Sequence, residues 1–289
     1  MKILILFLLA ALPLTAAEPI RVSTFSTILT EIAEQVGGAR VAVTGHVKPD
    51  VDPHEFEPKP TDMKTVGNAQ LILLSAKHME GYVGKLKEAT GAKGRLVEVG
   101  NGFASLKLKD DHGHDHGDED PHWWHSIANV GKAAKIVRDE LSKVSPDDRA
   151  AFAENTAKYV AQLDALQKWV KAKVAELPRD QRKLVTSHDA FQYFAKEHGF
   201  TIYAIEGLSS SDQPSSKKVG EIIAAIRSQR VKAIFPESIQ NPKVLTEITR
   251  ETGAKVGNEL YADGLGKGEA ATFAGMYKHN VTAIVEALK

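Results

Sequence analysis

The feature that most constrains the fold is one long apolar stripe in the middle of the chain. From Ser145 onward, apolar side chains recur at spacings of three, four and seven residues, the period of a single buried helix face. The stripe consists of Phe152, Tyr159, Leu163, Leu166, Val170, Val174 and Leu177. A helix over 145–178, ended by Pro178, would be roughly 50 Å long. We interpret it as a rigid helix linking two lobes, although an ordinary amphipathic helix within one domain has the same pattern.

Short apolar runs alternate with helical patterns on both sides of this helix. The expected strands are 20–24, 41–47, 71–74 and 95–99 before it, and 183–187, 201–205, 232–235 and 254–256 after it. Strands that alternate with helices favour parallel sheets covered by helices. The sequence therefore predicts an α/β fold with two lobes, each a parallel sheet flanked by helices. We place the N-terminal lobe at 18–144 and the C-terminal lobe at 179–289.

The amino terminus has the pattern of a secretory signal peptide. Lys2 precedes an apolar run from Ile3 to Leu14, and small residues follow before Glu18. This run is short for a bilayer span, and no later run is long enough. We therefore expect residues 1–17 to be removed and the mature chain to be exported as a soluble protein.

Composition restricts the partners and the chemistry. The chain has 37 basic and 37 acidic residues, so no net charge draws it to nucleic acid. It has no cysteine, so we expect no disulfide and no lipid anchor attached to a cysteine. Any metal must then be bound by histidine and carboxylate side chains.

Segment 110–120 is rich in histidine and acid. His112, His114 and His116 alternate with glycine and aspartate. Imidazole binds zinc or copper better than calcium, and acidic neighbours add negative potential. We interpret the segment as a histidine-rich loop that captures metal with low affinity. A solvated surface loop without a metal role is the alternative.

Four possible metal ligands lie where predicted strands end or loops enter helices. They are His54 and His122 in the first half, and His188 and Asp263 in the second. In parallel α/β sheets, ligands bind beyond the carboxyl ends of the strands. Each residue alone would more often be structural. Together they predict a metal site in the cleft between the lobes.

The same residues stand in four motifs that resemble those of a known family. The motifs are DPHEFEPKP at 52–60, DPHWW at 120–124, TSHDAFQY at 186–193 and YADGL at 261–265. The motifs and their order are similar to those of the zinc and manganese solute-binding proteins of bacterial ABC importers. The resemblance extends over essentially the whole chain.

The resemblance implies that His54, His122, His188 and Asp263 bind one divalent ion between the lobes. Manganese members typically have glutamate at the third position, where this chain has His188. Three imidazoles and one carboxylate also suit tetrahedral zinc, whereas manganese prefers more oxygen. We therefore expect Zn(II) as the transported ligand, with Mn(II) as the alternative.

The resemblance also implies the setting in which the protein works. It predicts a monomeric periplasmic protein that delivers zinc to an ABC permease and its ATPase in the inner membrane, with a periplasmic metallochaperone as a further partner. Nucleic acid is not expected as a partner. A surface adhesin on the same scaffold is one alternative. A zinc hydrolase is a weaker one, because catalytic zinc keeps one position open and Asp263 would close it.

Two further residues near the predicted site have open roles. His125 stands where the family usually has an apolar residue, at helical spacing from His122. It could be a transfer ligand, a donor to a ligand or a surface residue at a helix start, and we favour the surface residue. Glu237 follows strand 232–235 and resembles an acidic family position. It could bond a ligating histidine or cap a helix.

Overall fold

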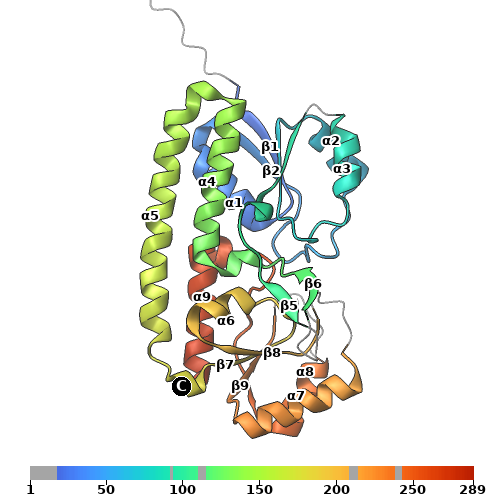
Figure 1. The fold of residues 1–289 in the computed structure, drawn as a ribbon, viewed down its shortest axis with the longest axis vertical. Coiled ribbons are helices and arrows are strands. Elements are labelled where there is room, and N and C mark those ends of the chain that lie inside the picture. The colour runs from blue at the N-terminus through green and yellow to red at the C-terminus, as the bar shows by residue number, and fades with distance from the viewer. Residues whose placement is uncertain (1–17, 92–93, 110–114, 208–213, 238–242) are drawn as a thin grey trace, which may run out of the picture.

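Two parallel sheets form the frame of the protein in the computed structural model. The structure describes residues 18–91, 94–109, 115–207, 214–237 and 243–289. The predicted signal peptide, residues 1–17, lies outside the described residues. The two sheets belong to separate lobes stacked along the longest axis of the molecule (Figure 1).

The first sheet has the strand order β2-β1-β3-β4, with every pair parallel. Its strands are β1 (Ile20–Thr24), β2 (Val41–Gly45), β3 (Leu71–Leu74) and β4 (Arg95–Glu98). All residues of the central strand β3 are buried. Burial on both faces explains its continuous apolar run.

The second sheet repeats this arrangement, with the order β10-β9-β7-β8 and all pairs parallel. Its strands are β7 (Lys183–Thr186), β8 (Thr201–Ala204), β9 (Ala233–Phe235) and β10 (Lys255–Val256). They begin and end within two residues of the predicted bounds, because the apolar runs that form them are bordered by polar residues, glycine or proline.

Helices flank both sheets (Figure 1). Those of the first half are α1 (Thr27–Gly37), α2 (Pro60–Gly67), α3 (Val83–Thr90) and α4 (Ile127–Val144). Those of the second half are α6 (Gln192–His198), α7 (Ser216–Gln229), α8 (Lys243–Thr252) and α9 (Phe273–Leu288). Hydroxyl side chains cap several of them, as Ser26 does for α1, Ser126 for α4 and Thr272 for α9. None of the helices in the described ranges is long and apolar enough to cross a membrane.

The long helix α5 (Arg149–Val174) runs beside α4 and α9 and extends from one lobe to the other (Figure 1). All residues of the predicted apolar stripe are buried, including Leu177 just beyond the helix. The helix is shorter than the sequence predicted, since a 3₁₀ turn occupies Pro146–Asp148. At 26 residues it is about 39 Å long. The predicted two-lobed α/β fold with one long helix between the lobes is confirmed.

A small antiparallel hairpin lies between the lobes (Figure 1). It consists of β5 (Lys107–Lys109) and β6 (Asp115–Glu119), with Lys107 opposite the acidic Glu119. The expectation of a loop throughout 110–120 is therefore wrong for 115–119, where pairing with β5 extends the backbone. Residues 110–114 lie outside the described residues.

Residues from both halves of the chain hold the base of this hairpin. The ammonium of the buried Lys77 lies 3.8 Å from the Glu119 carboxylate. The Tyr193 hydroxyl accepts a hydrogen bond from the Leu106 amide at 3.0 Å and donates to the Asp120 carbonyl at 3.4 Å. The chain entering the predicted metal site at 120–122 is thus anchored on both lobes.

One buried carboxylate joins three helical elements of the core. Glu31 on α1 accepts hydrogen bonds from the Tyr159 hydroxyl of α5 at 3.1 Å and from the Phe273 amide at the start of α9 at 2.6 Å. Burial raises the pKa of the Glu31 carboxyl. Because both donors are buried with it, Glu31 is an attachment point between the sequence-distant α1, α5 and α9.

Replacing Glu31 by leucine should therefore destabilise the fold. Glu31→Leu leaves two buried donors without their acceptor, at about 1–3 kcal/mol each, so the free energy of unfolding should fall by about 3 kcal/mol. Denaturant unfolding measures this change. Glu34→Leu, at an exposed position of the same helix, is the matched control and should change it by less than about 0.5 kcal/mol. Equal effects of the two substitutions would contradict the assignment.

Candidate metal centre

Two copies of one tripeptide present the first pair of histidines. In Asp52-Pro53-His54 and in Asp120-Pro121-His122, the aspartate Oδ1 accepts a hydrogen bond from the histidine amide, at 2.8 and 2.9 Å. Aspartate favours such a hydrogen bond between its carboxylate and the backbone amide two residues later, which closes a tight turn. Asp120 Oδ1 also lies 2.9 Å from His122 Nδ1. The second copy thereby orients its imidazole ring as well as its backbone.

The third histidine follows strand β7 and is held by Glu237. Glu237 Oε1 accepts hydrogen bonds from the amides of Ser187 and His188, at 3.1 and 3.3 Å. Glu237 Oε2 is hydrogen-bonded to His188 Nδ1. Since Nδ1 of His188 faces this carboxylate, Nε2 faces the other way, toward Asp263. Carboxylates that hold the far nitrogen of a metal-ligating imidazole in this manner are common in metal sites.

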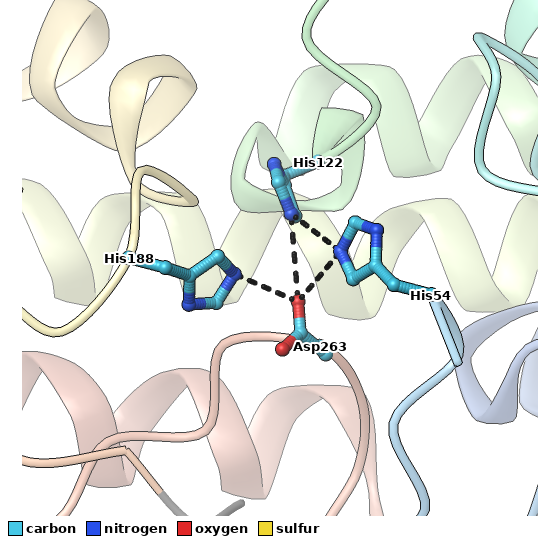
Figure 2. A group of neighbouring side chains, drawn as sticks. All are labelled: His54, His122, His188 and Asp263. Atoms are coloured by element: carbon cyan, nitrogen blue, oxygen red, sulfur yellow. Dashed lines mark hydrogen bonds and ion pairs between the residues drawn. The ribbon is translucent and has the colours of Figure 1, made fainter. Parts of the chain in front are cut away.

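The four predicted ligands come together, two from before α5 and two from after it (Figure 2). One donor atom of each of His54, His122, His188 and Asp263 lies within 4.8 Å of the others. Asp263 Oδ1 is 3.2 Å from Nε2 of His188, 3.5 Å from Nε2 of His122 and 3.6 Å from Nε2 of His54. The Nε2 atoms of His54 and His122 are 3.2 Å apart.

Four of the six donor separations match those of a tetrahedral metal site. Donors about 2.0–2.1 Å from a central ion, at the corners of a tetrahedron, lie about 3.3 Å apart. The four separations of 3.2–3.6 Å bracket this value, and the two from His188 to His54 and to His122 are within 4.8 Å. His122 and His188 are fully buried and Asp263 nearly so, whereas 11% of the His54 side chain is exposed. Solvent therefore reaches the group from the side of His54.

The electrostatics of the group favour a cation. Burial by itself lowers the pKa of the His122 imidazole, but hydrogen bonds and charges from Asp120 and Asp263 outweigh it and raise the pKa to about 9. At His188, burial is likewise outweighed by Asp263 and Glu237, so the pKa lies well above its usual value. The His188 charge and hydrogen bonds from the three histidines outweigh burial at Asp263 and hold its pKa well below the usual range. Protonated imidazole rings here supply the positive charge beside Asp263 that a bound metal ion would otherwise supply.

His125 is not the surface residue that the sequence favoured. Its side chain is buried, its ring lies 4.4 Å from that of Phe191 between centroids, and Nε2 lies 2.8 Å from the Ala262 carbonyl oxygen. The reason is that 123–125 form a 3₁₀ turn rather than the exposed start of α4, which begins at Ile127. Burial lowers the His125 pKa to about 3, so the ring is neutral.

Three histidines predicted to capture metal remain to be placed. His112 and His114 lie outside the described residues, and His116 falls on β6, whose backbone alone is described there. The sequence assigned no role to Asp120, although it precedes His122 by two residues as Asp52 precedes His54. That repeated spacing is the signal that could have identified it.

Comparison with known proteins identifies the family. The profile described as zinc-uptake complex component A, periplasmic (ZnuA), matches residues 22–287, nearly the whole chain. The chain belongs to this family. It is therefore a metal-binding solute-binding protein of the ABC importer type, and the resemblance noted in its four motifs is confirmed. Members of the family work with an ABC permease and an ATPase.

Similar proteins carry names that refer to different metals. The manganese-binding lipoprotein MntA of Bacillus subtilis (strain 168) is 31% identical over 282 residues, covering 95% of this chain and 92% of MntA. The zinc-binding protein TroA of Treponema pallidum (strain Nichols) is 30% identical over 278 residues, covering 94% of this chain and 89% of TroA. A solved structure of periplasmic zinc-binding TroA superimposes with a TM-score of 0.86 at 29% identity, covering 94% of this chain and 99% of that one.

Metal affinity should rise with pH. Since burial is outweighed by the carboxylates and the His122 pKa is raised to about 9, a metal must displace a proton from this imidazole at neutral pH. Affinity should therefore increase roughly tenfold per pH unit for each displaced proton between about pH 6 and 8, and level off above the raised pKa. Competition titrations at several pH values, with calorimetry in two buffers, measure the slope and the protons released. A constant affinity over this range would contradict the prediction.

Proposed function

We propose that the protein captures Zn(II) at His54, His122, His188 and Asp263 and delivers it to an ABC permease driven by its ATPase. The observation that carries the proposal is the set of three imidazole nitrogens and one carboxylate oxygen within 4.8 Å of one another, with the carboxylate oxygen 3.2–3.6 Å from each nitrogen. The protein binds and releases its cargo without changing it chemically. Four protein donors would occupy all tetrahedral positions, which leaves none for the water that a catalytic zinc activates.

The donor set supports zinc over manganese. Zinc is bound well by nitrogen donors in tetrahedral geometry, whereas manganese prefers carboxylate, carbonyl and water oxygens in higher coordination. His122, His188 and Asp263 are buried, so few waters can complete a larger coordination shell. Burial and donor type therefore point to the same metal.

Manganese is the second candidate, because MntA and other similar proteins are named for it. The second oxygen of Asp263 could raise the coordination number, and solvent near His54 could supply a water. The two metals differ in how much they need His188. A zinc site depends on the His188 nitrogen, while a manganese site gains little from it.

Replacement of His188 distinguishes the two metals. The metal content of the native protein should be zinc, and zinc should win a competitive titration against manganese. His188→Ala should weaken zinc binding by more than about 100-fold, because even outer hydrogen-bond partners of ligands contribute about 10–100-fold. Copper is titrated alongside, since it suits imidazole donors too.

The control for this experiment is His78→Asn. His78 is exposed and has φ 66, a conformation that asparagine tolerates, so zinc binding should not change. Fluorescence reports loading, because Trp124 packs edge-on against His122 with ring centroids 5.4 Å apart. Tight manganese binding that His188→Ala leaves unchanged would overturn the zinc assignment.

We further propose that His112, His114 and His116 collect zinc at low affinity and raise its concentration near the main site. The support is the placement of the hairpin, whose base runs directly into Asp120 and His122. A periplasmic metallochaperone would be a natural source or recipient of zinc held there.

Deleting Asp110 to Gly117 should slow zinc uptake by cells when zinc is scarce and leave the high-affinity site filled in the purified protein. The physical reason is that weak binding of zinc by these histidines matters only when the rate at which zinc ions reach the main site limits its loading. Replacing His112, His114 and His116 by asparagine keeps the length of the segment and should slow uptake equally. An uptake rate equal to that of the wild type in both variants would exclude this role.

A further inference from the structure

The chain segment that carries Asp263 is held by the segment that carries His122. The carbonyl oxygen of Ala262, the residue before Asp263, accepts hydrogen bonds from Trp124 Nε1 and His125 Nε2, both at 2.8 Å. A carbonyl oxygen has two lone pairs, so these two ring donors satisfy it fully. Residues separated by 137 and 138 positions in sequence are therefore fixed to each other immediately beside two predicted ligands.

The ring of His125 is itself fixed. It is buried and packs on Phe191, and the His125 carbonyl accepts a hydrogen bond from the Tyr277 hydroxyl at 2.7 Å. Because Nε2 faces a carbonyl oxygen, it carries the proton and donates. His125 thus acts as a rigid donor of fixed direction.

Other contacts hold the Asp263 segment on either side of this point. The Tyr261 amide and carbonyl pair with the side chain of Asn280, at 2.9 and 2.8 Å. The Leu265 amide donates to Thr27 Oγ1 of α1 at 2.8 Å. Between these anchors, the backbone next to Asp263 is restrained by Trp124 and His125. The position of the Asp263 carboxylate relative to His122 therefore depends on this pair of donors.

We propose that His125 is a positioning residue for the metal site: by holding the Ala262 carbonyl, it places the Asp263 carboxylate at binding distance from His122. The proposal rests on the proposed function, since it presupposes that these residues bind metal. Without the His125 donor, the Ala262 carbonyl loses one of two partners and the Asp263 segment gains freedom. A bound ion should then leave faster.

Substitutions at His125 that differ in reach test the proposal. In H125Q the side-chain amide can extend to the place of Nε2, whereas in H125N it falls short of the Ala262 carbonyl. H125L fills the space without any donor. Zn(II) affinity by competition, the Zn(II) dissociation rate after addition of chelator, and the visible spectrum of the Co(II)-loaded protein are measured for each.

The matched control is H198L. His198 is also a buried histidine packed on a phenylalanine, with a pKa that burial lowers to about 4, and its Nε2 has no hydrogen-bond partner among the described residues. Leucine there should alter stability as H125L does without affecting the Asp263 segment. H198L should therefore keep wild-type zinc affinity, dissociation rate and Co(II) spectrum.

We expect H125L and H125N to raise the Zn(II) dissociation constant and dissociation rate about tenfold and to change the Co(II) spectrum, with H125Q within about threefold of wild type. If H125L fails to fold, the contrast between H125N and H125Q decides. Equal binding by H125N, H125Q and wild type would overturn the positioning role alone. Equal weakening in H125Q and H125N would overturn it too, since packing and not donation would matter. Failure of wild-type protein to bind zinc tightly would overturn the proposed function and this inference together.

Discussion

The structure depends on one buried carboxylate, that of Asp263, which faces the imidazoles of His54, His122 and His188 where loops from both lobes meet. Burying a charge is costly unless opposite charges and hydrogen bonds compensate for it. Here the compensation comes from protonated rings or from a bound cation. A metal bound here as proposed would therefore compete with protons for the same place, and this competition would make the site selective for a cation and responsive to acid.

The fold supplies this arrangement through the ends of parallel strands. His188 follows β7, and Glu237, which holds it, follows the neighbouring strand β9. His54 and His122 approach from the first half on turns of the same Asp-Pro-His type. Because α5 packs beside both α4 and α9, it links the two halves that carry the donors. The donors are thus placed by elements whose own cores are closely packed.

Around the donors, each restraint has an identifiable partner. Asp120 orients His122, Glu237 orients His188, and Trp124 and His125 hold the backbone beside Asp263. His54 is the most exposed of the four donors. The restrained donors His122 and His188 are buried, while His54 lies at the exposed side of the group. This arrangement suits a protein that must hold an ion and later release it.

The sequence by itself determined the α/β class, the strands and the apolar stripe of α5, because these follow from local periodicity and burial on the faces of regular elements. It also singled out His54, His122, His188 and Asp263, because their motifs are contiguous in sequence. Only the tertiary structure decided that Asp120 orients a ring, that Asp115–Glu119 pair with β5, and that His125 is buried against Ala262. The contact of His125 with Ala262 joins residues 137 positions apart, so it arises only when distant segments of the chain pack together. Asp120 and the strand 115–119 have partners close in sequence, but neither periodicity nor an apolar pattern predicts a hydrogen bond between two side chains or the pairing of a polar strand.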